Sequence, residues 1–124
     1  MMNKMRILDL SLTYHWYDMI ASGEKREEYR ELKKFYFKRL NCEWKLHLED
    51  GCYKGCTDFI WNKERCARCK CFQAFPYDAV RFHRGQGGKV SMLVECKGIR
   101  IGVGKKEWGA PKEPVFIIEL GEKL

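Results

Sequence analysis

The sequence lacks the features that mark secreted, membrane-spanning or repetitive proteins. Its first ten residues, MMNKMRILDL, contain neither the long apolar core nor the small-residue cleavage site of a signal peptide. No stretch is apolar for long enough to span a membrane, and there is neither an internal repeat nor a low-complexity tail. We therefore expect a soluble cytoplasmic protein with no membrane partner.

Several catalytic and cofactor signatures are also missing. The chain has no H-E-x-x-H helix, no dinucleotide-binding glycine fingerprint and no Ser-His-Asp order of the kind found in serine proteases. The segment GQGGK is rich in glycine but lacks the full P-loop pattern. These absences argue against a protease, a zincin-type metalloenzyme and a Rossmann-type dehydrogenase.

The composition is that of a folded, basic domain. With 124 residues, 45% of them hydrophobic and 33% charged, the chain is the size of one domain spanning 1–124. Its 24 Lys and Arg residues exceed its 17 Asp and Glu residues, which gives a formal net charge of +7. Such a charge favours polyanions such as nucleic acid, although many basic proteins gain only solubility from it.

The hydrophobic pattern predicts an α+β fold in which strands outnumber helices. A short apolar run predicts a strand over residues 5–12, and Thr13 can cap a helix over residues 14–22 that ends at Gly23. Trp16, Met19 and Ile20 form the apolar stripe of this helix, so we expect Trp16 in the core. A second helix is expected in LKKFYFKRL, and further strands in DAVRF, SMLVECKGI and VFIIEL. This order predicts a small curved sheet or barrel with one or two flanking helices.

A dense run of charges, EKREEYRE, follows the first predicted helix. As an extended strand it would place Arg26, Glu28 and Arg30 on one side, so that one polar side could point at a ligand. Lys25, Glu28 and Arg30 could form ordinary surface ion pairs of little energetic value. They could instead bind a phosphate or carbonyl oxygen, with the carboxylate orienting the cations or moving a proton.

Gly23, Lys25, Glu28 and Arg30 spell G-x-K-x-x-E-x-R, which resembles the signature of ASCH domains in the PUA-like superfamily. The order of predicted elements agrees with that family over nearly the whole chain outside its cysteine-rich middle. The resemblance implies a small PUA-like β-barrel with a cleft beside the first helix, where an RNA or nucleotide-like ligand binds. It makes Lys25, Glu28 and Arg30 the candidate ligand-binding residues.

The same resemblance offers an enzymatic alternative. Some small members of the superfamily are amidohydrolases of acylated cytidine nucleosides that use a lysine, a threonine and a glutamate. Here Glu28 stands where that threonine would fall, so the hydroxyl nucleophile is missing. Glu107 lies roughly where the distant glutamate would be. A hydrolase acting on RNA or on a modified nucleoside, with Lys25 and Glu28 as catalytic residues, is the alternative to simple binding.

The middle of the chain, residues 42–71, has the composition of a cysteine-rich insertion and contains six of the seven cysteines. Two close pairs within it could supply four thiolates to a tetrahedral structural zinc ion: Cys52, Cys56, Cys66 and Cys69. Cys42, His47 and Cys71 are spare ligands. Reduced cysteines without a metal are the alternative.

Two further sets of residues are candidates for ligand contact. His83 and Arg84 adjoin the glycines of GQGG, which would allow a phosphate to approach the backbone, although a hairpin turn is the more ordinary interpretation. Tyr29 and Trp108 could stack on unpaired bases or simply pack.

Overall fold

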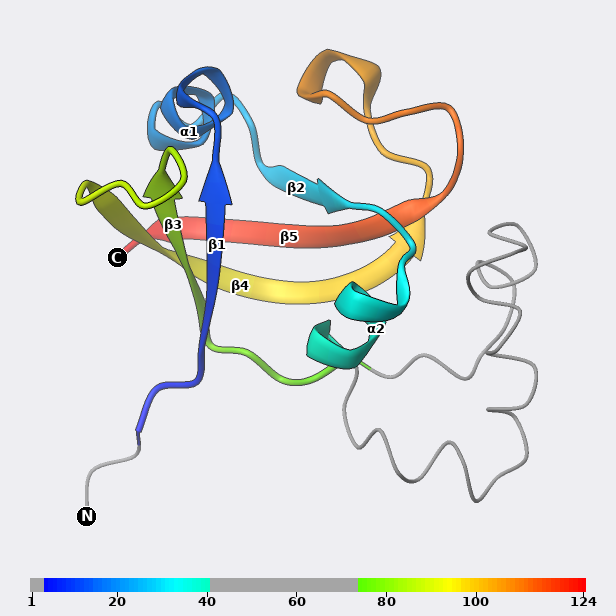
Figure 1. Cartoon of the computed structure of the whole chain (residues 1–124), viewed down its shortest axis with the longest axis horizontal. Coiled ribbons are helices and arrows are strands. Elements are labelled where there is room, and N and C mark those ends of the chain that lie inside the picture. The colour runs from blue at the N-terminus through cyan, green and yellow to red at the C-terminus, as the bar shows by residue number, and fades with distance from the viewer. Residues whose placement is uncertain (1–3, 41–73) are drawn as a thin grey trace. The chain divides into compact units, whose positions relative to one another are not determined.

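The structure is a computed structural model that describes residues 4–40 and 74–124 (Figure 1). The cysteine-rich insertion predicted over 42–71 lies outside the described residues. So do its proposed zinc ligands Cys52, Cys56, Cys66 and Cys69.

The described residues form an α+β protein, as predicted from the sequence. The strands are β1 (Ile7–Leu12), β2 (Glu27–Arg30), β3 (Ala79–Arg84), β4 (Ser91–Gly102) and β5 (Val115–Lys123). They are hydrogen-bonded in the order β1-β3-β4-β5-β2, with β1 parallel to β3 and β3 antiparallel to β4. The helices are α1 (Tyr14–Ala21), α2 (Lys34–Leu40) and the short 3-10 helix η2 (Lys106–Trp108). No helix in the described part of the chain is both long and apolar enough to cross a membrane.

The contacts divide the chain into two compact units. The first unit comprises Met1–Glu28, Pro76–Gly98 and Ile118–Leu124, and the second comprises Tyr29–Phe75 and Ile99–Ile117. The first unit contains α1, β1 and β3, and the second contains α2 and η2. The expectation of a single domain stays a prediction.

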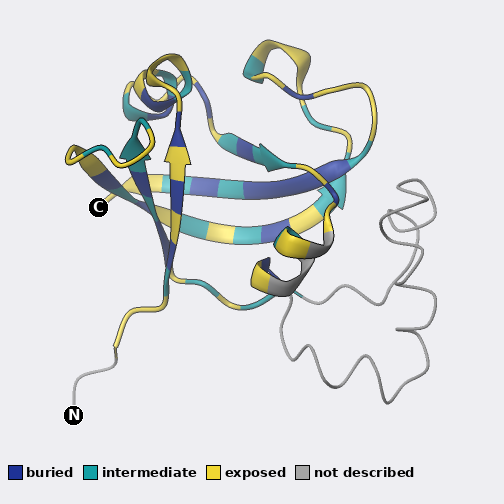
Figure 2. Cartoon of the chain, in the orientation of Figure 1, coloured by how far each residue is buried: buried dark blue, intermediate teal, exposed yellow. Residues whose placement is uncertain are grey.

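The core of the first unit is built by the two-residue alternation of its strands. In β1 the three leucines are buried while the intervening Asp9 and Ser11 are exposed (Figure 2). In-register pairing places Leu8 beside Val80 and Leu10 beside Phe82, so apolar side chains of β1 and β3 share one face of the sheet. Val80, Phe82, Met92 and Val94 are all buried as the alternation predicts.

Helix α1 packs against β1 and β3, and its ends agree with the sequence pattern. Thr13 occupies the N-cap position, although its side chain makes no capping hydrogen bond. After the C-cap, Gly23 has a φ of +86°, which glycine adopts without the steric cost that a Cβ would bring.

The prediction that Trp16 belongs to the core is wrong. Trp16 is only half-buried, and the buried side chains of α1 are Tyr17 and Ile20. These two residues are separated by three positions and therefore share one helix face. The sequence pattern assigned Trp16 to the buried face instead of its neighbour Tyr17. Both residues carry a large apolar ring, so the pattern does not distinguish them.

The second unit has its own apolar residues. Leu32 and Leu40 flank or end α2, and Phe116 and Ile117 lie in β5; each is at most 1% exposed. The backbone N–H of Phe75 donates to the carbonyl oxygen of Leu40 at 2.7 Å. The second predicted helix is confirmed, but it begins at Lys34 rather than at Leu32.

Candidate functional site

The charged segment after α1 is held in place by main-chain hydrogen bonds. The N–H of Lys25 donates to the carbonyl oxygen of Met19 at 3.1 Å, which continues the turn that Gly23 begins. Further on, the N–H of Leu120 donates to the carbonyl oxygen of Arg26 at 3.0 Å. The segment is therefore fixed at one end to α1 and at the other to β5.

Lys25 and Glu28 form a buried ion pair. The Lys25 Nζ lies 2.8 Å from the Glu28 Oε1, and the two side chains are 3% and 7% exposed. These are the buried charged residues of the described ranges 4–40 and 74–124. The Lys25 ammonium also lies 4.5 Å from the centroid of the Trp16 ring, a cation–π contact. For this pair, the interpretation as a surface ion pair is wrong.

Burying two charges is costly unless each is compensated. Removing an ammonium and a carboxylate from water costs several kcal/mol per ion in real proteins, and their attraction repays this only with good geometry and further hydrogen bonds. In many proteins, replacing such an ion pair with hydrophobic residues of similar size leaves the stability of the fold unchanged or raises it. A buried pair beside a pocket is thus a candidate functional site rather than a device for stability.

Arg30, the last residue of the motif, belongs to the second unit. Its Nη1 donates to the Tyr36 hydroxyl at 3.1 Å, and its guanidinium carbon lies 5.6 Å from the centroid of the same ring. Arg30 is half-buried, whereas Arg26 is exposed and Glu28 is buried. These three residues therefore do not share one environment, in part because Arg26 precedes the first residue of β2, where strand alternation begins.

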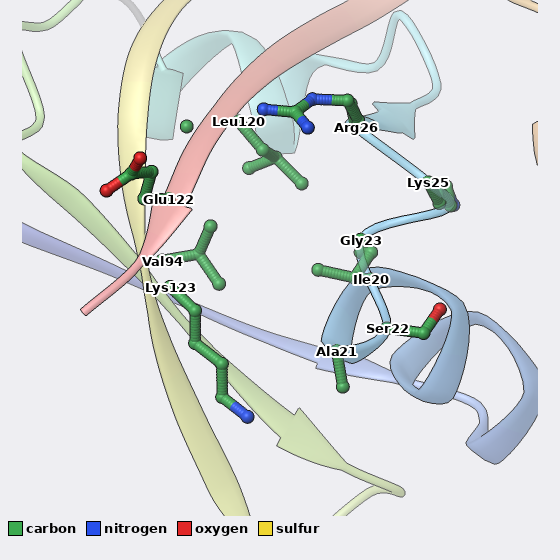
Figure 3. Close-up of a pocket in the computed structure, with 11 residues that line it drawn as sticks. Ile20, Ala21, Ser22, Gly23, Lys25, Arg26, Val94, Leu120, Glu122 and Lys123 are labelled. Atoms are coloured by element: carbon green, nitrogen blue, oxygen red, sulfur yellow. The ribbon is translucent and has the colours of Figure 1, made fainter.

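A pocket of about 260 Å³ adjoins the buried pair (Figure 3). We call it the charged pocket. It lies in the first unit, among the C-terminal end of α1, the segment that follows it, and the end of β5. Its charged lining residues are Lys25, Arg26, Glu122 and Lys123, three cations against one carboxylate.

The side chains around the charged pocket come from distant parts of the chain. In Figure 3, Arg26 reaches from the segment after α1 toward β5, and the Glu122 carboxylate points away from the Lys123 ammonium. Glu28 is not among the residues that line the pocket, and its carboxylate contacts the ammonium of Lys25, which is one of them. Sequence reasoning missed Glu122 and Lys123 as pocket residues, because nothing near the end of the chain signals a site.

His83 and Arg84 are both engaged with carboxylates, and neither lines the charged pocket. The His83 Nε2 lies 2.9 Å from the Asp9 Oδ1. Arg84 donates from Nε and Nη2 to the two carboxylate oxygens of Asp18, each at 3.1 Å. This hydrogen bonding from Arg84 holds the pKa of Asp18 below its ordinary value of 3.8 and raises the pKa of Arg84.

The glycine-rich segment beside them is a hairpin turn. The N–H of Arg84 donates to the carbonyl oxygen of Val90 at 2.9 Å, and the N–H of Gly88 donates to that of Gly85 at 3.1 Å. This turn joins β3 to β4, which confirms the ordinary interpretation of the segment.

The two aromatic candidates for base stacking lie in the second unit. The Tyr29 hydroxyl accepts the N–H of Lys105 at 2.9 Å, and a Cβ on Gly104 would overlap the Tyr29 ring. Tyr29 therefore packs against the loop before η2. Trp108 is half-buried with the Lys105 Nζ 4.4 Å from its ring centroid, and Glu107 is exposed in η2.

No cluster of three or more His, Cys, Asp or Glu side chains within residues 4–40 and 74–124 could hold a metal ion. The one cysteine in these ranges is Cys96, which is half-buried, and this burial raises the pKa of its thiol. The structural zinc site stays a prediction, because Cys52, Cys56, Cys66 and Cys69 lie outside the described residues.

Comparisons with known proteins give no relative for this chain. No protein-family model matches it, and neither does any curated protein or solved structure. The functional argument therefore rests on the residues and geometry of the chain itself.

Proposed function

We propose that this protein is an ASCH-like module that binds RNA or a nucleotide-like ligand in the charged pocket. The observation that carries the proposal is the buried Lys25–Glu28 pair, whose lysine lines that pocket. The G-x-K-x-x-E-x-R spacing and the α+β sheet support the same proposal, in which the sheet belongs to a PUA-like barrel of a cytoplasmic protein.

The charges of the pocket favour an anionic ligand. Lys25, Arg26 and Lys123 outnumber Glu122, and the chain as a whole carries a formal charge of +7. Lysine and arginine side chains are the usual partners of phosphate groups. A volume of about 260 Å³ is near the lower end of the range for small-molecule sites and suits one phosphate with its sugar.

The geometry assigns different roles to the members of the pair. Lys25 lines the pocket, while Glu28 holds the Lys25 ammonium from a buried position. A general acid or base must come within hydrogen-bond reach of the proton that it transfers. Because Glu28 is not a lining residue, the geometry favours binding over the hydrolase alternative.

RNA binding is tested with the full chain and a short fluorescent single-stranded RNA across a salt series. We expect the logarithm of the association constant to fall linearly with the logarithm of salt concentration. Arg26→Ala and Lys123→Ala should each weaken binding and reduce this slope by about 0.7, because each removes one phosphate contact. Both side chains are exposed, so neither change should unfold the protein.

Lys97→Ala is the matched control. Lys97 is exposed on β4 and does not line the charged pocket, so its loss removes the same charge from a different place. Equal weakening by Lys97→Ala would show that the net charge, not the pocket, binds RNA. An absence of binding at low salt would overturn the proposal.

The hydrolase alternative is tested on the same protein by following the integrity of the RNA and of acylated nucleosides. If the wild type consumes either substrate and Glu28→Gln abolishes turnover while retaining affinity, the protein is an enzyme. If the substrates stay intact, the binding function stands alone.

A further inference from the structure

A second pocket lies in the first unit, where β1 meets α1 and the hairpin turn between β3 and β4. Its volume is about 480 Å³, and we call it the Tyr14 pocket. It is lined by Ser11, Leu12, Thr13, Tyr14, Gly85 and Gln86. None of these side chains carries a formal charge, in contrast to the charged pocket. The lining therefore offers no charged partner to an ionic ligand, which favours a neutral one.

Tyr14 is the most unusual residue of this pocket. It is the first residue of α1, and it is 60% exposed although its ring is large and apolar. The Arg84 guanidinium carbon lies 4.1 Å from the ring centroid, within the range of a cation–π contact. Exposed aromatic rings of this kind are a recurrent surface for stacking planar ligands.

The Arg84 side chain is itself fixed. Asp18 lies four residues after Tyr14 and thus on the same side of α1, and it accepts two hydrogen bonds from Arg84. The guanidinium is thereby held against the tyrosine ring by Asp18, a residue of the same helix. A ring that is already ordered loses little conformational freedom when a ligand stacks on it.

The hairpin turn closes on the edge of the same ring. The N–H of Gly85 donates to the carbonyl oxygen of Leu12 at 2.7 Å, which joins the turn to the end of β1. Gly85 has a φ of +81°, and a Cβ at this position would lie 2.9 Å from the Tyr14 Cε1. Glycine is therefore required both by the backbone and by the close approach of the ring.

We propose that the Tyr14 pocket binds a neutral planar heterocycle, such as the base of a nucleoside, by stacking it on the Tyr14 ring. The Thr13 hydroxyl makes no capping hydrogen bond to α1, and the amide of Gln86 lies on the exposed turn. Together they offer donors and acceptors to the edge of such a ring. The volume of the pocket is within the usual range for ligands of this size.

This site does not depend on RNA binding at the charged pocket. A neutral ring held by stacking should bind with little dependence on salt, whereas a phosphate held by cations should bind more weakly as salt rises. The two binding proposals can therefore be disproved independently of each other. The competing explanation is that Tyr14 serves only to hold Arg84 and the hairpin turn.

The experiment titrates the full chain with adenosine, guanosine, cytidine and uridine, each at low and at high salt, and with ribose as a control. We expect the nucleosides to bind with equal affinity at both salt concentrations, purines more tightly because of their larger stacking area, and ribose not to bind. Tyr14→Phe should retain the affinity, and Tyr14→Leu should lower it by about tenfold or more. Arg26→Ala should leave it unchanged.

Phe35→Leu is the matched control variant. Phe35 is 59% exposed and has the Arg39 guanidinium carbon 5.8 Å from its ring centroid, but it belongs to the second unit and does not line this pocket. Its substitution should leave nucleoside affinity unchanged. Thr13→Val and Gln86→Ala provide a second measurement that keeps Tyr14 and its contacts, and each should weaken binding.

The proposal is overturned if the wild type binds no nucleoside at millimolar concentration or if ribose binds as well as the nucleosides. Equal affinity of wild type and a folded Tyr14→Leu variant would likewise show that Tyr14 only holds the turn. If Tyr14→Leu does not fold, unchanged affinity in both Thr13→Val and Gln86→Ala overturns the proposal instead.

Discussion

Two ion pairs in the first unit have similar lengths and very different surroundings. The Lys25–Glu28 pair, at 2.8 Å, has side chains that are 3% and 7% exposed, whereas in the Arg84–Asp18 pair, at 3.1 Å, they are 35% and 58% exposed. The exposed pair is solvated and screened, so it adds little to stability. The charges of the buried pair have lost their hydrating water. The Lys25 ammonium is stabilised instead by the Glu28 carboxylate and by the Trp16 ring.

The difference separates two kinds of function for charged side chains. The buried pair lies beside a small charged pocket that Lys25 helps to line, and the pair is shielded from water on its other sides. The exposed pair holds a guanidinium against an aromatic ring beside an uncharged pocket. The distances between the nitrogen and oxygen atoms alone would not have distinguished the two pairs.

The largest expected effect comes from breaking the buried pair on one side. Lys25→Met should lower the free energy of unfolding by about 3–5 kcal/mol, because it leaves the Glu28 carboxylate buried without its cation. Denaturant unfolding of the full chain measures this loss. A loss below about 1 kcal/mol would mean that the carboxylate reaches water.

The double variant Lys25→Met with Glu28→Leu is the control for that measurement. Replacing both charges with apolar groups of similar size removes the unpaired charge, so most of the stability should return. The same double variant should still lose RNA affinity, which separates the proposed binding role of Lys25 from its structural role.

A smaller effect is expected at the glycine that turns the chain toward the buried pair. Gly23→Ala places a Cβ on a residue with a φ of +86°, where the surrounding space is open and the penalty is only conformational. We expect a loss of about 1 kcal/mol in the free energy of unfolding. The matched control is Glu24→Ala at the next residue, whose side chain is exposed; an equal loss in the two variants would contradict the explanation.

The smallest effect is expected at the exposed pairs, whose contribution to stability is present at neutral pH and is lost in acid. Hydrogen bonding from Arg84 lowers the pKa of Asp18, and hydrogen bonding from the Arg6 backbone N–H lowers that of Asp78, both from an ordinary value of 3.8. A carboxyl group with a lowered pKa in the folded state contributes stability that is fully present well above 3.8 and is lost as pH falls through the folded-state value. Stability should therefore decline below about pH 4.

Asp18→Asn tests this source of acid sensitivity. The variant should be slightly less stable than the wild type at neutral pH, and the difference should vanish in acid, since both proteins are then uncharged at this position. Thermal unfolding at several pH values measures the difference. A difference that stays constant with pH would exclude the titration of Asp18 as its cause.

Much of the fold could be predicted from the sequence, because the spacing of apolar residues and the residue types that form turns are local features. The alternation of β1, the stop at Gly23 and the apolar run that becomes β5 each depend on neighbouring residues only. The buried face of α1 could not be predicted, since Trp16 and Tyr17 are both large aromatic residues and packing decides which one is buried.

The candidate site was predictable in part. The sequence singled out Lys25 and Glu28 by their spacing, but it offered surface pairing and ligand binding as equal interpretations. For His83 and Arg84 it offered a phosphate contact beside the more ordinary hairpin turn. It did not indicate that their side chains have carboxylate partners more than sixty positions away in the chain: Asp9 and Asp18. Contacts across that separation leave no periodic signal.

The sequence by itself determined which residues could bear charge, where the chain turns and which strand faces are apolar, since these depend on side-chain chemistry and short-range geometry. Only the tertiary structure decided that the Lys25–Glu28 pair is buried, that Lys123 joins Lys25 at one pocket, and that Arg84 lies against Tyr14. Burial determines how strongly a charge interacts with its neighbours. It requires the whole fold, because residues from several distant segments together exclude water.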